Sequence, residues 1–273
     1  MSTLYLVGTP IGNLGDFSPR GIEILKTVDF IAAEDTRVTQ KILNRFEIKK
    51  PTVSYYEHNL REKGDLIADR IAAGESCALV TDAGMPAISD PGEDLVRICS
   101  QRGIEVIAVP GPAACTTALA LSGLSTSRFT FEGFLSVNKQ SRREHLESLH
   151  NESRTMVFYE APHKLKKTLN DMAESFGMER KISLCRELTK IHEEVIRTNF
   201  KDAIKLYENL APRGEFVLVV EGKAPELKSA AVLDDAVQLA RSLMDTGIPP
   251  AQAAKESAKI TGIKKSDIYK AIV

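Results

Sequence analysis

Several polar side chains directly follow short apolar runs, where a buried strand would end beside a ligand. Glu34, Asp35 and Arg37 follow the apolar run 30–33. A carboxylate there could orient or accept the proton of a hydroxyl group, and the guanidinium could hold a phosphate. The alternative is a helix N-terminus with a structural ion pair. Further candidates in comparable places are Asn13, His58, His163, Arg186, Glu187 and Lys190.

The lysine and the two histidines among these candidates also fit a purely structural role. Lys190 would act as a base only if burial lowered its pKa, and a lysine on the surface of a hairpin is the alternative. His58 and His163 could equally be hydrogen-bonded structural histidines. Asn13 belongs to a glycine-rich loop and could position a ligand from there.

Three Gly/Pro loops occur where predicted strands end, at residues 8–15, 82–92 and 110–114. The first has the glycine spacing G-x-x-x-G-x-x-G, which differs from the dinucleotide fingerprint, and no glycine-rich run continues into Lys and Ser/Thr as a P-loop does. A dinucleotide or a nucleoside triphosphate is therefore disfavoured. Loops with few charges but open main chains favour a ligand held by N–H and C=O groups, with a slot for adenine.

The loop 82–92 is the densest of the three and connects a buried strand to a helix. We expect Asp90 to be the N-cap, with Pro91 at the first helical position and Glu93 completing a capping box. In an open α/β sheet such a junction lies where ligands bind. The alternative is that the loop is only a connector.

The order of predicted elements indicates two α/β domains and a helical tail. Strands at 3–7, 30–33, 51–55, 77–80 and 104–109 alternate with helices, which predicts a parallel sheet with right-handed crossovers over domain 1–122. In domain 123–222, strands at 181–186 and 191–197 follow each other closely, which predicts a mixed sheet. Residues 223–273 form a linker and three short helices, at 234–245, 250–260 and 266–272, of which the last two resemble a helix-turn-helix.

Composition is that of a globular protein without a membrane span. The 273 residues include 43% hydrophobic and 27% charged residues. No signal peptide is recognisable, and the four widely spaced cysteines form neither a disulfide framework nor a metal pattern, so we expect a cytoplasmic protein without a metal. The net charge is −4 for 1–120, +1 for 121–222 and +2 for 223–273, which permits a nucleic-acid partner. Basic residues that could contact phosphates are Lys139, Arg142, Arg143, Lys164, Lys166, Lys167, Lys264, Lys265 and Lys270. The alternatives are a solvated charged face for the helices, where Glu144 and Glu147 are acidic neighbours, and a helix pair in the tail that only caps the domain.

The combination of motifs resembles the tetrapyrrole methylase superfamily over essentially the whole chain, and within it the members that methylate small-subunit ribosomal RNA. The motifs are VGTPIGNL at 7–14, AEDTR at 33–37, DAGMP at 82–86 with SDPG at 89–92, VPGPA at 109–113, FYEAPH at 158–163 and RGE at 213–215.

This resemblance implies a two-domain enzyme, usually a homodimer, that uses S-adenosyl-L-methionine to methylate the 2′-hydroxyl of a cytidine in the decoding region of 16S rRNA. Met85 stands where tetrapyrrole-modifying relatives often carry an acidic residue, which implies a main-chain role there. The cofactor contacts implied by position are Pro10, Gly84, Met85, Ile88, Gly111, Ala113, Ala114, Glu160, Ala161, Gly214 and Glu215.

Two other functions remain open at this point. A methyltransferase acting on a tetrapyrrole would share the fold, but it would need an open apolar trough where the block 34–37 stands. A non-enzymatic regulator that binds nucleic acid through its tail would leave the three strand-end loops without a role.

Overall fold

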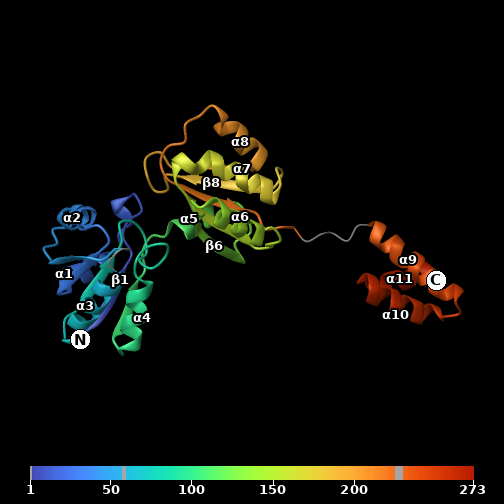
Figure 1. The fold of residues 1–273 in the computed structure, drawn as a ribbon, viewed down its shortest axis with the longest axis horizontal. Coiled ribbons are helices and arrows are strands. Elements are labelled where there is room, and N and C mark those ends of the chain that lie inside the picture. Colours follow the sequence, from blue (N-terminus) through green and yellow to red (C-terminus); the bar gives the residue numbers. More distant parts are fainter. Residues whose placement is uncertain (1, 57–59, 225–229) are drawn as a thin grey trace. The chain divides into compact units, whose positions relative to one another are not determined.

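The protein, analysed as a computed structural model, is described over residues 2–56, 60–224 and 230–273. It forms two compact units, Met1–Lys223 and Ala224–Val273. Unit Met1–Lys223 contains two five-stranded sheets (Figure 1). The first is entirely parallel, has the order β3-β2-β4-β1-β5, and consists of β1 (Thr3–Val7), β2 (Phe30–Ala33), β3 (Thr52–Ser54), β4 (Cys77–Val80) and β5 (Glu105–Val109).

Helices cover both faces of this sheet, which explains why its central strands are continuous apolar runs. One face packs against α1 (Pro19–Thr27) and α2 (Thr36–Arg45). The short η1 (Leu14–Asp16) precedes α1. The other face packs against α3 (Leu60–Ala72) and α4 (Glu93–Gln101). β2 and β4 are buried at every position. The predicted parallel α/β sheet is confirmed.

The second sheet is mixed, as predicted, with the order β6-β7-β10-β8-β9. Only β6 and β7 pair in parallel among the described strand pairs of this sheet. The predicted strand 191–197 begins later, because Glu187 and Thr189 adopt positive φ values in a turn that extends the connection. The strands are β6 (Phe129–Phe134), β7 (Thr155–Glu160), β8 (Lys181–Arg186), β9 (Glu194–Asn199) and β10 (Phe216–Val220).

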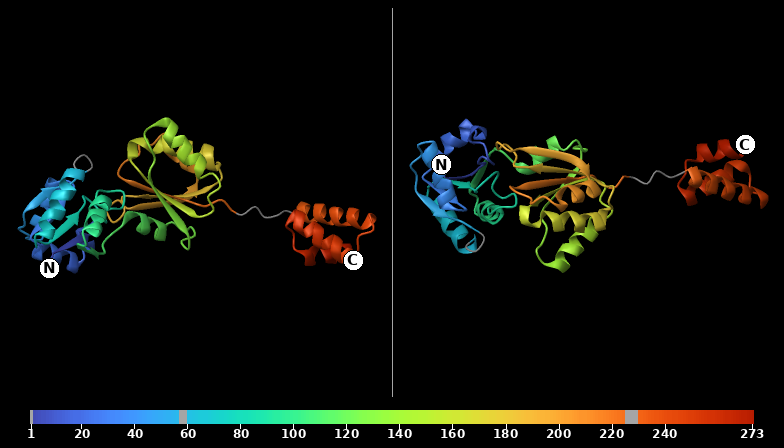
Figure 2. Two further views of the ribbon diagram at one scale, coloured as in Figure 1. Left: turned by 60° about the horizontal axis from the view of Figure 1, so that its bottom comes forward. Right: turned by 90° about the horizontal axis from the view of Figure 1, so that it is seen from above.

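Helices also cover both faces of the second sheet (Figure 2). One face carries α6 (Lys139–Ser148), η2 (Pro162–Lys164), α7 (Leu165–Phe176) and α8 (Phe200–Glu208). The opposite face packs against α5 (Ala114–Leu121), through Ala118 and Leu119 on the helix and Val217 and Val219 on β10. The expected boundary between domains at 122/123 stays a prediction, although α5 lies on the second sheet.

Unit Ala224–Val273 contains α9 (Ala230–Asp245), α10 (Pro250–Thr261) and α11 (Lys265–Ile272), as predicted except that α9 begins four residues earlier. Its core is made largely of alanines, which allow the helices to approach closely. The buried Ser257 donates a 2.6 Å hydrogen bond to the carbonyl of Ala236. Gly262, with a φ of 69°, ends α10 in the left-handed conformation. Over the described residues, no helix combines the length and apolar character needed to cross a bilayer.

Candidate functional site

The three loops expected to bind a ligand follow β1, β4 and β5, which are neighbours in the sheet. Their main chains bond to one another. Thr9 and Gly84 form an antiparallel bridge with N–H to O distances of 2.9 and 3.1 Å, and the N–H of Gly8 donates to the carbonyl of Val109. A Cβ on Gly111 would lie 2.7 Å from the oxygen of Gly8, so glycine is required for this approach. The three loops therefore form one rigid layer.

The loop after β4 differs from its prediction. The N-cap of α4 is Gly92, with a φ of 146°, and not Asp90, so the expected capping box is wrong. The reason is a tight turn in which Ala87 and Ser89 both have positive φ values and the N–H of Ala87 donates to the carbonyl of Pro91. Such conformations cost about 1–3 kcal/mol each and cluster at binding sites. The turn leaves the Asp90 carboxylate at a cavity rather than on the helix end.

A cavity of about 530 Å³ lies between this layer and the second sheet, within the size range of small-molecule sites. Its wall is mostly small or aliphatic, with a few polar groups. The lining residues are Ile11, Ala83, Gly84, Met85, Ile88, Ser89, Asp90, Ala113, Ala114, Phe134, Tyr159, Glu160, Ala161, Pro162, His163, Cys185, Leu188, Glu215, Phe216 and Val217.

Eight of the eleven expected cofactor contacts line this cavity, namely Gly84, Met85, Ile88, Ala113, Ala114, Glu160, Ala161 and Glu215. Pro10, Gly111 and Gly214 are not among the lining residues. Pro10 is buried, and Gly111 packs on Gly8. Gly214 packs on Glu187, since a Cβ there would lie 2.5 Å from Cγ of that side chain. These three positions thus shape the loops that surround the cavity.

The wall contributed by the second sheet is fixed by hydrogen bonds. The hydroxyl of Tyr159 accepts a 3.1 Å bond from the N–H of Cys115 in the first turn of α5. That helix has no side-chain cap on its N-cap residue Ala113. Tyr159 therefore supplies the missing acceptor from another element, and its ring is held against the cavity.

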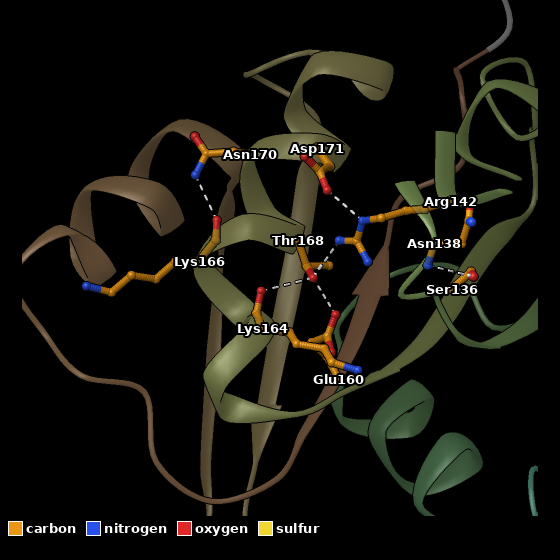
Figure 3. A network of polar contacts seen from close by, with 9 residues as sticks. All are labelled: Ser136, Asn138, Arg142, Glu160, Lys164, Lys166, Thr168, Asn170 and Asp171. Atoms are coloured by element: carbon orange, nitrogen blue, oxygen red, sulfur yellow. Dashed lines mark hydrogen bonds and ion pairs between the residues drawn. The ribbon is translucent and has the colours of Figure 1, made fainter. Parts of the chain in front are cut away.

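Glu160 is 4% exposed and is held by a buried network (Figure 3). One of its oxygens accepts from the N–H of Ala161 at 2.8 Å, and the other accepts from the hydroxyl of Thr168. Arg142 donates to that hydroxyl at 2.7 Å and to Asp171 at 2.6 Å. A buried carboxylate without such partners would cost several kcal/mol. The network joins the cavity wall to α6 and α7.

Asp35 and Arg37, expected to act on a hydroxyl and a phosphate, form an ion pair at the surface. Asp35 caps α2 through the N–H of Arg37 at 2.8 Å and also accepts from its guanidinium, at 3.0 and 2.7 Å. The Arg37 side chain is 87% exposed. Hydrogen bonds from Arg37 lower the pKa of Asp35 to about 2. The pair thus makes the contacts of the structural alternative, and the exposed guanidinium is still accessible to a phosphate.

Glu34 lies beside a second group of carboxylates. Its side chain accepts from the N–H of Asp82 at 3.4 Å, and Asp82 in turn accepts from the N–H of Asp35 at 3.2 Å. Burial raises the pKa of Glu34 and of Asp82. Glu34 and Asp90 line the same groove beside the cavity. Burial, with smaller contributions from the charges of Glu34 and Asp82, raises the pKa of Asp90 to about 7.

Lys190 lies in the turn after β8, beside the cavity residues Leu188 and Glu215. The ammonium of Lys190 pairs with Glu187 at 2.8 Å and with Glu215 at 2.9 Å. Burial acts to lower the pKa of Lys190, but the hydrogen bonds to the two carboxylates raise it above its usual value. This direction opposes a role as a base. Asn13 donates from its N–H to Thr189 at 3.1 Å, so the loop after β1 rests on the turn that holds Lys190.

The remaining candidates are placed differently. His163 lines the cavity, whereas Arg186 pairs with Glu194 at 3.0 Å. His58 lies outside the described residues. Among the residues that sequence analysis did not assign to the cavity are Asp90, Phe134 and Tyr159. Tyr159 stands next to Glu160 in a motif already singled out, but nothing in the sequence signals Phe134.

The basic residues on α6 and α7 are less available than expected. Arg142 is buried in the Glu160 network, and Arg143 pairs with Glu147 at 2.7 Å. Lys166 donates to the carbonyl of Glu208 at 3.0 Å. Lys139 and Lys167 line a groove of about 660 Å³ that also contains Glu147, Asp171 and Glu174. In the C-terminal unit, Lys264, Lys265 and Lys270 are all exposed.

Both units of the chain match sequence models of known protein families. A sequence model described as Tetrapyrrole (Corrin/Porphyrin) Methylases matches residues 3–204, and one described as RsmI C-terminal HTH domain matches residues 230–273. Among solved structures, a diphthine synthase superposes with a TM-score of 0.65 at 16% identity, over 81% of this chain and 90% of its own. The uroporphyrin-III-C-methyltransferase from Thermus thermophilus gives 0.58 at 18% identity, over 81% and 94%. At these identities the likeness concerns the fold alone.

Curated relatives are much more similar in sequence. Proteins named ribosomal RNA small subunit methyltransferase I from Synechocystis sp. and Bacillus subtilis are 46% and 42% identical, over 98% and 99% of this chain and 96% and 94% of their own lengths. One from Thermotoga maritima is 47% identical over its entire length, which matches only 82% of this chain. The chain therefore belongs to the ribosomal RNA small subunit methyltransferase I family of the tetrapyrrole methylases.

Proposed function

We propose that the protein transfers a methyl group from S-adenosyl-L-methionine to the 2′-hydroxyl of a cytidine in the decoding region of 16S rRNA. The single observation that carries the choice of acceptor is its similarity, at 46% and 42% identity, to nearly full-length relatives named for methylation of small-subunit ribosomal RNA. The cytidine and its 2′-hydroxyl rest on the resemblance of the sequence motifs.

The cavity supports the choice of methyl donor. Its lining combines the small residues Gly84, Ala113 and Ala114 with the aliphatic side chains of Ile11 and Leu188. A nucleoside with a short amino-acid tail fits such a wall, since the base needs apolar contacts and the tail needs main-chain N–H and C=O groups. When bound, the donor supplies an electrophilic methyl group on a sulfonium, and the electron pair of the broken C–S bond stays on the sulfur.

The chain contributes alignment and a proton acceptor. Because the hydroxyl oxygen must approach the methyl carbon in line, rigid walls provide the largest part of the acceleration. The hydroxyl proton must pass to a base when the new C–O bond forms. We assign this role to Glu34 or Asp90, because the two share a groove beside the cavity. Arg37 would hold an RNA phosphate, fixed in direction by Asp35. Lys190 and Asn13 would position the loop after β1.

We also propose that the C-terminal unit binds the small ribosomal subunit. It matches a helix-turn-helix description, and three lysines on or beside α11 are exposed. The Thermotoga relative is matched along its whole length by 82% of this chain. The remaining part of this chain has no counterpart in that relative. The unmatched share is close in size to Ala224–Val273. Binding of the donor is therefore assigned to unit Met1–Lys223 alone. A homodimer remains an expectation from the family.

Labelled S-adenosyl-L-methionine, incubated with the protein and with 30S particles, naked 16S rRNA or a tetrapyrrole precursor, tests the proposal. We expect label in the RNA and none in the tetrapyrrole, and nuclease digestion should recover it on a cytidine 2′-oxygen. Label in the tetrapyrrole would favour the small-molecule alternative, and label in neither would favour a regulator. Deleting residues 225–273 should weaken binding to 30S particles and leave the donor affinity unchanged.

A further inference from the structure

Strand β6 contains an irregularity that turns one aromatic ring toward the cavity. In its pairing with β7, Phe131 faces Val157 and Gly133 faces Phe158, so Glu132 is an extra residue in the ladder. Gly133 has a φ of 61°, which only glycine adopts readily. In a regular strand, residues 131 and 134 would point to opposite faces. The bulge instead places both on one face.

The ring contacts confirm this placement. Phe131 and Phe134 both meet the ring of Tyr159 edge-on, at centroid distances of 5.0 and 5.5 Å. Tyr159 is itself fixed by the N–H of Cys115. Phe134 is therefore held by an aromatic neighbour that cannot turn freely. Aromatic pairs of this geometry prefer a defined orientation.

Phe134 remains 58% exposed although it lines the cavity. A phenylalanine left in water forgoes the stabilisation that burial of its ring would give. A Cβ on Gly133 would lie 3.4 Å from Oγ of Ser89, so the end of β6 rests against the loop after β4. The exposed ring thus stands at the rim, beside the loop that carries Asp90.

We propose that the ring of Phe134 is the platform on which the base of the acceptor nucleotide stacks. This inference rests on the proposed function, since it requires an RNA acceptor. Unpaired bases in RNA are recognised by stacking on aromatic side chains, whatever their sequence. The carboxylate of Asp90 lines the same cavity and, when ionised, would repel a phosphate, whereas a neutral base fits beside it. Stacking here would bring the attached ribose toward the methyl donor.

The competing occupant of the ring is the adenine of the donor. An adenine in a donor site is enclosed on most of its surface, and the buried lining residues Leu188 and Val217, each 6% exposed, offer that enclosure. The exposure of Phe134 fits a partner that arrives from solvent as part of a large RNA. The two occupants predict different variant behaviour.

The test compares variants of Phe134 with a control on the same strand. Phe129 is also exposed, at 40%, but does not line the cavity, so Phe129→Ala makes the same change of side chain away from the site. The measurements are KM and kcat for 30S particles at saturating donor, and the donor Kd by calorimetry. Folding of each variant is checked by its thermal unfolding midpoint.

We expect Phe134→Ala to raise KM for 30S particles roughly ten-fold to a hundred-fold, the range of one stacked base, with the donor Kd changed less than two-fold. Phe134→Trp should retain KM within about three-fold, and Phe134→Leu should resemble Phe134→Ala, because leucine keeps the bulk but has no π face. Phe129→Ala should behave as the unsubstituted protein.

Three outcomes would overturn the proposal. An equal loss of donor affinity in Phe134→Ala would assign the ring to adenine. Full activity in Phe134→Ala or Phe134→Leu would leave stacking without a role, while the proposed function would stand. If the unsubstituted protein methylates no RNA, the proposed function is refuted, and the stacking proposal fails because it requires an RNA acceptor.

Discussion

Two acidic residues at the ends of strands, Asp35 and Glu160, have opposite environments. Asp35 follows β2 and forms a surface pair with Arg37, whose side chain is 87% exposed. Glu160 ends β7, is 4% exposed, and is held by Thr168 and the N–H of Ala161. The sequence places both carboxylates at strand ends, where a ligand could lie. They differ in burial, because Glu160 is buried and Asp35 is at the surface. Glu160 is part of a rigid wall, whereas the Arg37 guanidinium paired with Asp35 is exposed to a partner.

The buried side of this comparison should show the largest effect on stability. Arg142→Ala would leave Thr168 and Asp171 without their guanidinium, and we expect the free energy of unfolding to fall by about 3–5 kcal/mol. Arg143→Ala is the matched control on the same helix, because its pair with Glu147 is exposed on both sides, and it should cost about 0.5 kcal/mol or less. Urea denaturation followed by tyrosine fluorescence measures both. Equal losses would contradict the ranking.

The rigidity of the loop layer gives the next effect, on donor affinity. Gly111→Ala forces a Cβ to within 2.7 Å of the Gly8 oxygen, so the loops after β1 and β5 must separate. We expect the Kd for S-adenosyl-L-methionine to rise at least ten-fold, about 1.4 kcal/mol. Gly15→Ala, in an exposed part of the loop after β1, should change it less than two-fold. An unchanged Kd in Gly111→Ala would show that the contact does not shape the donor site.

The exposed side of the comparison should affect turnover more than binding. We expect Asp35→Ala and Arg37→Ala each to reduce methylation of 30S particles roughly ten-fold, about 1.4 kcal/mol in the activation free energy, while the donor Kd stays constant. Steady-state kinetics and calorimetry on the same preparations provide the two numbers. If donor binding and turnover fall equally, the pair is structural and Arg37 holds no phosphate.

The smallest expected effect depends on pH and differs in sign between two aspartates. The pKa of Asp90 is raised to about 7, so the folded state binds a proton that the unfolded state releases above about pH 4, and stability falls as pH rises between these values. Asp90→Asn should therefore stabilise the protein at pH 8 by about 1 kcal/mol, allowing for partial exposure, and the gain should vanish toward pH 4.

Asp35→Asn is the control with the opposite sign. The pKa of Asp35 is lowered to about 2 by its bonds to Arg37, so its carboxylate favours the folded state above pH 4, and that contribution is lost as pH falls toward 2. The substitution should thus destabilise the protein at pH 8. Unfolding curves at pH 4, 6 and 8 compare the two variants. An effect of Asp90→Asn that stays constant between pH 4 and 8 would contradict its assignment. For Asp35→Asn, a further curve at pH 3 should show a smaller loss of stability than at pH 4 and above, and an unchanged loss would contradict that assignment.

Much of the fold follows from local sequence signals. The apolar runs 30–33 and 77–80 could be recognised as strands because both faces of the sheet are covered. The position of α5 could not be predicted, since its small residues show no preference for either sheet. The later start of β9 could not be predicted either, because Glu187 and Thr189 adopt a left-handed conformation without being glycine.

The candidate site was partly predictable for a related reason. Glycines, prolines and strand-end motifs indicate where the main chain opens, and eight expected contacts line the cavity. Side chains that line the cavity because the backbone is irregular are not indicated by any sequence motif. The prediction of Asp90 as a helix cap is wrong because a positive φ at Ser89 cannot be read from the sequence. Phe134 depends on a bulge that a plain alternation of residues does not reveal.

The most direct test is isothermal titration of the purified protein with S-adenosyl-L-methionine and with its demethylated product. We predict saturable binding of both at one site per chain, weakened at least ten-fold in Gly111→Ala and kept in Arg37→Ala. If titration of folded protein with either compound gives no binding heat, the assignment of the cavity to a methyl donor is contradicted.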